Sequence, residues 1–398
     1  MKLASRVARI KPSATLTINA KAKALKQQGK HIVNFGVGEP DFDTPVHIQD
    51  AAIQATKEGR TRYTAVGGID ELRDAVCQVI RKDYGLEYVR DNVLVSVGGK
   101  HALYNLFQAI LDSGDEVIIP SPFWVSYPDM VALADADSVF VSCPEADGFK
   151  RKPEALEKAI TPRTKMLILN SPSNPTGVHY TPAELKALAD VLMRHEQVTI
   201  VSDDIYYRIL YKGHEWSNIA MVEERLKDRT FILNGVSKTY CMTGWRIGYL
   251  VGDASVIKAA TKIQSQSTSN ATSIAQYAAL AALTGTQEIV VGMARVFEKR
   301  CQYVLDRLAG MSGITCPPPA GAFYVFPNFS AYYGRKDNGR EITNSLDMAD
   351  YLMEKANVAV VPGSAFGEDR CLRFSYALSM EDLKEGFDRT AAALEKLS

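Results

Sequence analysis

The sequence carries no excess of charge, because its 46 lysines and arginines are balanced by 46 aspartates and glutamates. Proteins that bind nucleic acids or anionic membranes usually carry a basic excess, so we expect neither partner. No uninterrupted apolar run is long enough to span a bilayer, and no apolar segment follows the basic residues near the first methionine. We therefore expect a cytoplasmic protein without a secretory signal.

Cysteine and histidine are scarce, with six residues of each type. The cysteines are scattered along the chain without close pairing, which is typical of reduced thiols in a cytosolic protein. The histidines form no His-x-x-x-His pair and no cluster with cysteine, so we expect no metal site. Hydrophobic residues make up 46% of the 398 positions, enough for two or three packed domains.

The middle of the chain alternates short β-branched runs with helical patterns. Five runs are apolar on both faces, as strands covered by helices must be; they span residues 93–97, 116–119, 165–169, 198–201 and 230–233. This alternation predicts an α/β fold with a mainly parallel sheet. One helix start is clear, because Thr181-Pro182-Ala183-Glu184 has the pattern of a capping box.

The C-terminal part has a different pattern. Three strands are predicted among helices, over residues 321–326, 358–362 and 371–376. We expect a smaller α/β domain over 291–398, a large domain over 45–290, and an N-terminal segment, 1–44, that joins the small domain.

Polar and aromatic residues follow each of the five central runs. They are Gly98-Gly99-Lys100, Ser121-Pro122-Phe123-Trp124, Asn170 to Pro175, Asp203 and Lys238. Open parallel sheets bind ligands outside the carboxyl ends of their strands, so these residues predict one site at one edge of the sheet.

Lys238 and Arg246 make pyridoxal phosphate the first cofactor to consider. A buried lysine has a lowered pKa, which frees its amine to form a Schiff base with an aldehyde. Arg246, Ser237 and the helix start at Gly98-Gly99-Lys100 can surround a phosphate. The alternative is that Lys238 is an ordinary solvated lysine.

Other residues of this group each have a functional and an ordinary interpretation. Asp203 can pair with a protonated pyridine nitrogen or cap a helix. Tyr206 and Asn174 can bond the phenolic oxygen of the ring, or serve as a core residue and a turn residue. Trp124 can stack on the ring or pack in the core. Arg373 can clamp a substrate carboxylate or form a surface salt bridge.

Six segments then carry a resemblance over nearly the whole chain. They are residues 35–42 (FGVGEPDF), 63–68 (YTAVGG), 170–177 (NSPSNPTG), 202–206 (SDDIY), 237–238 (SK) and 372–376 (LRFSY). The sequence resembles the class I aminotransferases of PLP fold type I, and especially the bacterial-type aspartate aminotransferases, a subgroup that includes aspartate/prephenate enzymes. The resemblance implies a seven-stranded, mainly parallel sheet between helices and a smaller α/β C-terminal domain.

The resemblance also implies a role for each matched residue. Lys238 binds pyridoxal phosphate and moves the proton, Asp203 pairs with the ring nitrogen, and Tyr206 bonds the ring oxygen. Further cofactor contacts come from Gly99, Lys100, Trp124, Asn174, Ser237 and Arg246, and from Tyr63 of a neighbouring subunit, which implies an obligate homodimer. The substrate contacts are Gly38, Asn174, Trp124 and Arg373, with Lys100 and Thr15.

Two positions depart from the animal-type enzymes of the family. Gly235 stands where those enzymes place a phosphate-binding serine, and residues 263–270 hold no arginine for the distal carboxylate of the substrate. In the bacterial-type subgroup the lysine of the Gly-Gly-Lys turn binds that carboxylate, which is Lys100 here. Thr15 and Lys100 also match positions linked to prephenate use.

We therefore expect an aspartate aminotransferase that uses 2-oxoglutarate in a ping-pong reaction. Prephenate transamination, alone or beside aspartate, is the first alternative. Aromatic amino acid or alanine transamination and a lyase reaction are less favoured. A non-catalytic, pyridoxal phosphate-binding regulator is the alternative of another class, but such proteins usually carry a DNA-binding domain and its basic excess, which we do not find.

Overall fold

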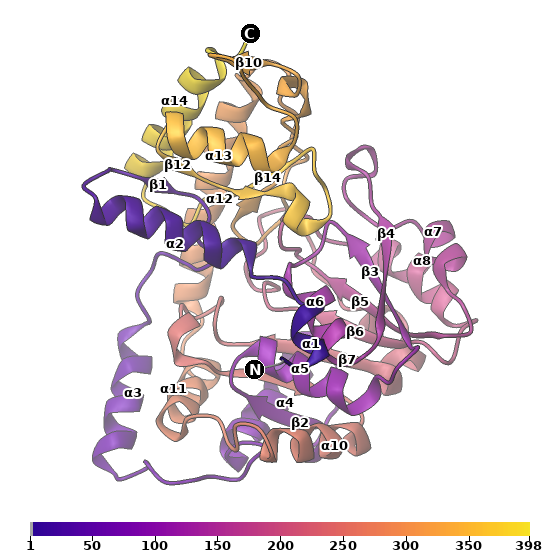
Figure 1. The fold of residues 1–398 in the computed structure, drawn as a ribbon. Coiled ribbons are helices and arrows are strands. Elements are labelled where there is room, and N and C mark those ends of the chain that lie inside the picture. The colour runs from indigo at the N-terminus through magenta and orange to yellow at the C-terminus, as the bar shows by residue number, and fades with distance from the viewer. Residues whose placement is uncertain (1–2) are drawn as a thin grey trace.

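The computed structural model describes residues 3–398, and its largest element is a seven-stranded sheet (Figure 1). The strand order is β2-β8-β7-β6-β5-β3-β4. The strands are β2 (Val93–Ser96), β3 (Glu116–Ser121), β4 (Asp137–Ser142), β5 (Thr164–Asn170), β6 (Thr199–Asp203), β7 (Thr230–Gly235) and β8 (Gly248–Val251). Only β8 is antiparallel to its neighbours, so the predicted mainly parallel sheet is confirmed.

Helices cover both faces of this sheet. They are α4 (Asp70–Tyr84), α5 (Gly99–Ile110), α6 (Ser126–Leu133), α7 (Pro153–Ala159), α8 (Pro182–Leu192), α9 (Ile219–Val222), α10 (Ala254–Ser265) and α11 (Ser273–Thr284). Successive residues of a strand point to opposite faces. On β5, Ile168 packs with the residues of α5 and α6, whereas Leu167 packs with those of α8. This two-sided burial explains why the central strands are continuously apolar.

The capping box predicted at Thr181 is present. The hydroxyl of Thr181 accepts a hydrogen bond from the backbone N–H of Glu184 at 3.3 Å, and the Glu184 carboxylate accepts one from the Thr181 N–H at 2.7 Å. Helix α8 begins at the next residue, Pro182.

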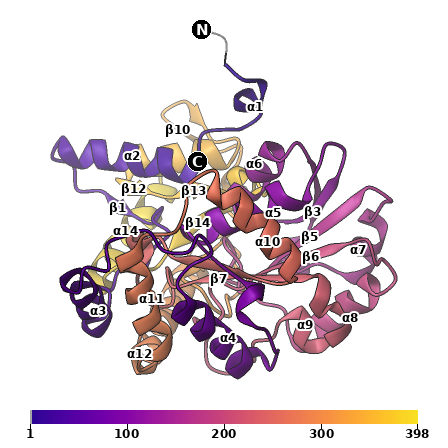
Figure 2. The ribbon, with the colours of Figure 1, turned by 90° about the horizontal axis from the view of Figure 1, so that it is seen from below.

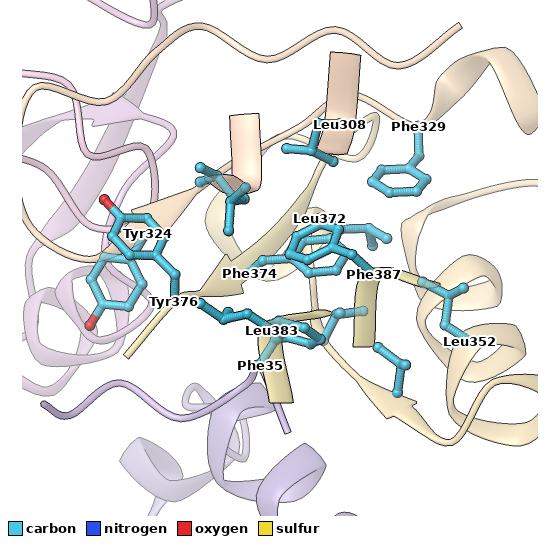
Figure 3. Close-up of a cluster of buried hydrophobic side chains, with 14 of the residues drawn as sticks. Phe35, Leu308, Tyr324, Phe329, Leu352, Leu372, Phe374, Tyr376, Leu383 and Phe387 are labelled. Carbon is cyan, nitrogen blue, oxygen red and sulfur yellow. The ribbon is translucent and has the colours of Figure 1, made fainter. Parts of the chain in front are cut away.

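The C-terminal elements form a separate group around their own apolar core (Figures 1 and 3). They are α12 (Glu288–Ala309), β9 (Tyr324–Val325), β10 (Lys336–Asp337), β11 (Arg340–Glu341), α13 (Ser345–Lys355), β12 (Val358–Ala359), β13 (Val361–Pro362), β14 (Leu372–Ser375) and α14 (Met380–Leu394). Strands β13, β14 and β9 form one sheet, whereas β12 pairs with β1 (Val33–Asn34). The prediction of one strand over 358–362 is therefore wrong, because the chain changes sheets at Val360.

The N-terminal segment contributes to both groups. It contains α1 (Ser5–Ala8) and α2 (Ala14–Gln27), and α3 (Val46–Lys57) follows it. Arg9, just after α1, forms an ion pair with Asp135 in the group around the large sheet. Helix α2 lies beside the C-terminal elements, as Figures 1 and 2 show, and its residues Ile18 and Ala22 pack with Met353. Phe35 packs edge-on against Phe374 at 5.3 Å between ring centroids. The domain limits at 44 and 290 stay a prediction.

Among residues 3–398, none of the helices combines the length and the apolar composition that crossing a bilayer requires.

Candidate active site

A cavity of about 480 Å³ lies at the carboxyl ends of β5, β6 and β7. Of the thirteen residues predicted for the site, twelve line it: Thr15, Gly38, Gly99, Lys100, Trp124, Asn174, Asp203, Tyr206, Ser237, Lys238, Arg246 and Arg373. Tyr63 does not line the cavity; its side chain is 90% exposed. The cavity therefore gathers residues from α2, α5 and β14 as well as from the central strand ends.

Lys238 lies three residues past the end of β7 and points into the cavity. Its Nζ donates a hydrogen bond to the carbonyl oxygen of Gly38 at 2.5 Å. The pKa of Lys238 is lowered to about 8, mainly by burial and with a smaller contribution from Arg373 and Arg246, while Glu39 opposes the shift. The solvated-lysine alternative is wrong, and the amine is closer to its basic form than an exposed lysine would be.

Asp203 is the last residue of β6 and is only 4% exposed. Its Oδ2 accepts a hydrogen bond from the Tyr127 hydroxyl at 2.6 Å, and its Oδ1 accepts one from the Ile205 N–H at 3.3 Å. Burial raises the pKa of Asp203 to about 6, against these two hydrogen bonds. The chain turns after β6 and no helix begins there within the described residues, so Asp203 is not a helix cap.

Arg373 is 2% exposed and enters the cavity from β14. Its Nη1 donates to Asn174 Oδ1 at 3.0 Å and its Nη2 donates to the Gly36 carbonyl at 2.9 Å. The guanidinium lies 4.7 Å from the centre of the Tyr324 ring. It forms no salt bridge with any carboxylate of residues 3–398, so the surface salt-bridge alternative is wrong and its charge is available to an anionic ligand.

Tyr206 contacts a second buried tyrosine. The hydroxyls of Tyr206 and Tyr324 are 3.0 Å apart, and burial raises the pKa of Tyr206 well above its ordinary value. Tyr206 thus keeps its proton at neutral pH and can donate a hydrogen bond into the cavity.

The start of α5 lies beside the guanidinium of Arg246. The N-cap Gly98 has a φ of 85°, and no side chain among the described residues caps the helix. A β-carbon added at Gly98 would lie 2.3 Å from Nη2 of Arg246, so only glycine allows the guanidinium this close. Arg246 itself is held by a hydrogen bond from Nη1 to the Thr243 carbonyl at 2.7 Å. Exposed N–H groups at a helix start beside an arginine favour a phosphate.

Lys100 is the second residue of α5 and lies over the face of Trp124. Its Nζ is 5.1 Å from the centre of the Trp124 ring. Burial lowers the pKa of Lys100, as does Arg246, while Asp129 opposes them with a smaller effect. Like Arg373 and Arg246, Lys100 has no carboxylate partner within 4 Å among residues 3–398.

These residues fit pyridoxal phosphate. Three unpaired cations face one cavity, and the helix start with Arg246 suits its phosphate. The buried Asp203 carboxylate has no cationic partner within the described chain, and a protonated pyridine nitrogen would supply one. Lys238 is the amine for its aldehyde, and Trp124 offers a flat ring.

Sequence reasoning did not single out three residues of the site. They are Tyr127, which contacts Asp203; Tyr324, which contacts Tyr206 and Arg373; and Glu39, which accepts a hydrogen bond from the Thr243 hydroxyl at 2.7 Å. Only Glu39 had a signal, because it stands inside the segment 35–42. The two tyrosines have the pattern of ordinary core residues.

Gly235 lies outside the cavity lining. A β-carbon there would lie 2.9 Å from the Cα of Gly248 and 3.0 Å from the carbonyl oxygen of Ile247. Strands β7 and β8 approach each other too closely for a side chain, which gives a packing reason for the missing serine.

Comparisons with known proteins agree with this geometry. A family model described as "Aminotransferase class I and II" matches residues 30–389. An aspartate/prephenate aminotransferase from Cereibacter sphaeroides is 50% identical over all of this chain and 99% of its own length. An aspartate aminotransferase from Geobacillus stearothermophilus is 50% identical over 99% of both chains. The solved structure of an aspartate aminotransferase from Rhizobium meliloti is 44% identical and has a TM-score of 0.97 over all of both chains.

Proposed function

Because this chain belongs to the class I and II aminotransferases, we propose that it transfers the amino group of L-aspartate to 2-oxoglutarate, which yields oxaloacetate and L-glutamate. The observation that carries the proposal is the set of three cations in one cavity, Lys100, Arg246 and Arg373, without carboxylate partners among residues 3–398. One phosphate and two substrate carboxylates would satisfy all three charges.

The family implies pyridoxal phosphate, and we propose that it binds in this cavity. When bound, this cofactor supplies an aldehyde that condenses with amines and a ring that accepts electrons from the α-carbon. Gly99, Ser237 and Arg246 would hold the phosphate, with Lys100 near it. Trp124 would stack on the ring, and Tyr206 and Asn174 would donate hydrogen bonds to its oxygen. Asp203 would hold a proton on the ring nitrogen through its negative charge.

Lys238 is the group that moves the proton. Its pKa of about 8 leaves a larger fraction of free amine at neutral pH than an exposed lysine has. The Nζ atom lies at the Gly38 carbonyl, 2.5 Å away, so a substrate bound between Gly38 and Arg373 would have its α-carbon near this amine. Lys238 takes the α-proton there and returns it to the other side of the transferred nitrogen.

The substrate is oriented by its two carboxylates. Arg373 and Asn174, already hydrogen-bonded to each other, bind the α-carboxylate as a preformed pair. Lys100 binds the distal carboxylate, and its reduced hydration in the cavity strengthens this attraction.

We further propose a homodimer with shared sites. Tyr63 is 90% exposed, and the depression lined by Thr44, Trp245 and Arg246 is open to solvent beside the phosphate site. Val46 and Ile53 on α3 are also exposed, at 70% and 51%. A partner protomer that placed its own Tyr63 at Arg246 would cover these surfaces.

Prephenate is the second candidate substrate. Relatives of this chain at 49–50% identity are named aspartate/prephenate aminotransferases. Thr15 lines the cavity from α2, where it could contact a substrate longer than aspartate. Prephenate also has two carboxylates, so the same cations suit it.

The test is a panel of amino donors with wild type and Lys100→Ala. We expect kcat/KM for aspartate to fall by about 10- to 150-fold, the value of one charge-assisted contact of about 1.5–3 kcal/mol, while alanine changes little. The exposed Lys165, replaced in the same way, is the matched control. Equal losses on aspartate and alanine would reject Lys100 as the distal-carboxylate group, and prephenate with a glutamate donor tests the second candidate.

A further inference from the structure

We propose that Tyr127 is a positioning residue for the cofactor: it orients the Asp203 carboxylate toward the pyridine nitrogen and links it to the Trp124 ring. The inference rests on the proposed pyridoxal phosphate site. It assigns a function to a residue that has no recognisable pattern in the sequence.

Tyr127 contacts two of the residues that we assign to the cofactor, Asp203 and Trp124. It is the second residue of α6 and only 2% exposed. Its N–H donates to the Trp124 carbonyl at 3.1 Å, and its ring meets the Trp124 ring edge-on, with centroids 5.2 Å apart and planes at 87°. Its hydroxyl donates to Asp203 Oδ2 at 2.6 Å. One buried side chain therefore contacts both the stacking residue and the residue that faces the ring nitrogen.

Among the described residues, Tyr127 is the only side chain that donates a hydrogen bond to the Asp203 carboxylate. The only other donor to it among the described residues is the Ile205 N–H, at a longer 3.3 Å. Tyr127 occupies one acceptor position of Oδ2, so the carboxylate cannot rotate freely and its remaining positions are available to a ligand. Neither neighbouring group replaces this hydrogen bond. The Tyr206 hydroxyl is paired with that of Tyr324, and the Asp204 carboxyl accepts its hydrogen bonds from Ser202, Asn218 and Tyr84.

Tyr127 acts as a donor over the whole working range of pH. Burial, and then Asp203 itself, raise the pKa of Tyr127 well above its ordinary value. A phenol that stays protonated favours the ionised form of the carboxylate it contacts. It thereby keeps the charge on Asp203 that a protonated ring nitrogen requires.

The neighbouring residue supplies a matched control. Asp204 accepts a hydrogen bond from another fully buried tyrosine, Tyr84, whose hydroxyl lies 3.1 Å from Oδ2. This second pair does not line the cavity. Tyr84→Phe removes the same chemical group from the same strand end without touching the cofactor site.

The experiment measures the binding of pyridoxal phosphate to cofactor-free wild type, Tyr127→Phe and Tyr84→Phe between pH 5 and 8, by absorbance and by quenching of tryptophan fluorescence. Tyr127→Phe should raise the dissociation constant about tenfold, the effect of one charge-assisted hydrogen bond. It should also move the acid side of the binding profile up by about one pH unit, because Asp203 is then protonated more easily. Tyr84→Phe should bind like wild type.

A double variant separates positioning from general packing. In an Asp203→Asn background, Tyr127→Phe should have no further effect on binding, because the carboxylate it serves is gone. The inference would be overturned if the two substitutions weakened the binding of pyridoxal phosphate additively. It would also be overturned if the pH dependence of binding were the same for Tyr127→Phe and wild type. If Tyr127→Phe alone does not fold, recovery of folding in the double variant supports it and continued unfolding rejects it. A wild-type protein that binds no pyridoxal phosphate would instead reject the proposed function.

Discussion

The two ends of the cavity are built from different parts of the chain. The end that we assign to the cofactor contains Gly99, Asp203, Ser237, Lys238 and Arg246, which all follow β2, β6 or β7 of the large sheet. We call this the cofactor end. It is supported by hydrogen-bonded strands and by close backbone contacts, as at Gly98 beside Arg246.

The residues that we assign to the substrate, which we call the substrate end, are Thr15, Lys100, Asn174 and Arg373, and the two ends meet where Lys100 follows Gly99 at the start of α5. These residues come from α2, α5, the loop after β5, and β14, and the outer two are 358 positions apart in the sequence. The residues assigned to the cofactor are therefore held by the strands of one sheet. The residues assigned to the substrate also come from α2 and β14, so their arrangement depends on how separate segments of the chain pack together. Changes at the cofactor end should affect all substrates alike, as should changes of Arg373 and Asn174, because every amino donor has an α-carboxylate. Changes of Lys100 and Thr15 should discriminate among substrates.

The largest effect is expected for Lys238→Ala. The variant loses the amine that holds the cofactor and moves the proton, so kcat/KM should fall by about 10⁴-fold for every amino donor. Borohydride treatment followed by mass spectrometry should fix the cofactor to wild type and not to the variant. If the variant kept wild-type turnover with any donor, Lys238 would not be required for all substrates, and the division of the cavity into a cofactor end and a substrate end would be wrong.

The next largest effect is expected on the stability of the cofactor-free protein, through the buried carboxyl group of Asp203. Its pKa rises from an ordinary 3.8 to about 6 on folding, so the folded state binds more protons than the unfolded state between these pH values. Stability should therefore fall as pH rises from about 4 to 6. Asp203→Asn removes this loss and should stabilise the cofactor-free protein by roughly 2–3 kcal/mol at pH 7, with little gain at pH 4.

Urea unfolding at pH 4 and pH 7 checks this prediction, with binding of pyridoxal phosphate measured in parallel. The variant should bind the cofactor more weakly although it is more stable without it. Equal stability gains at both pH values would mean that the charge of Asp203 is not the cause.

The smallest effect is expected for Thr15→Val at the substrate end. The substitution keeps the shape of the side chain and removes a hydroxyl that lines the cavity from α2. One neutral hydrogen bond is worth about 1 kcal/mol, so kcat/KM for prephenate should fall about fivefold while aspartate stays nearly unchanged. A loss of the same size on both substrates would assign Thr15 to a general role.

The sequence allowed most of the cofactor end to be predicted, because its residues follow short, β-branched apolar runs that alternate with helical patterns, as strands covered on both sides do. Lys238 and Asp203 were recognisable in this way. Strand β8 was not predicted, because it has only four residues, Gly248–Val251. Nothing in its sequence indicates that it runs antiparallel to its neighbours. The strand expected over 358–362 was divided because its two halves pair with β1 and β14.

Contacts between side chains that are far apart in the chain could not be predicted from the sequence. Tyr127 and Tyr324 have the pattern of core residues, and their hydroxyls gain a function only because Asp203 and Tyr206 lie opposite them. Arg373 was ambiguous between a salt bridge and a carboxylate clamp. Its burial and its hydrogen bonds to Asn174 and Gly36 removed the ambiguity.

Local patterns in the sequence are enough to name the residues that could do chemistry, since strand ends, glycine turns and a lysine that follows an apolar run are all local features. The burial of that lysine, and which charges remain unpaired, depend on the tertiary structure. Whether Lys100, Arg246 and Arg373 find a carboxylate depends on the neighbours that folding brings within about 4 Å, and those neighbours come from any part of the chain. The three unpaired cations that support a dicarboxylate substrate are therefore a property of the folded protein.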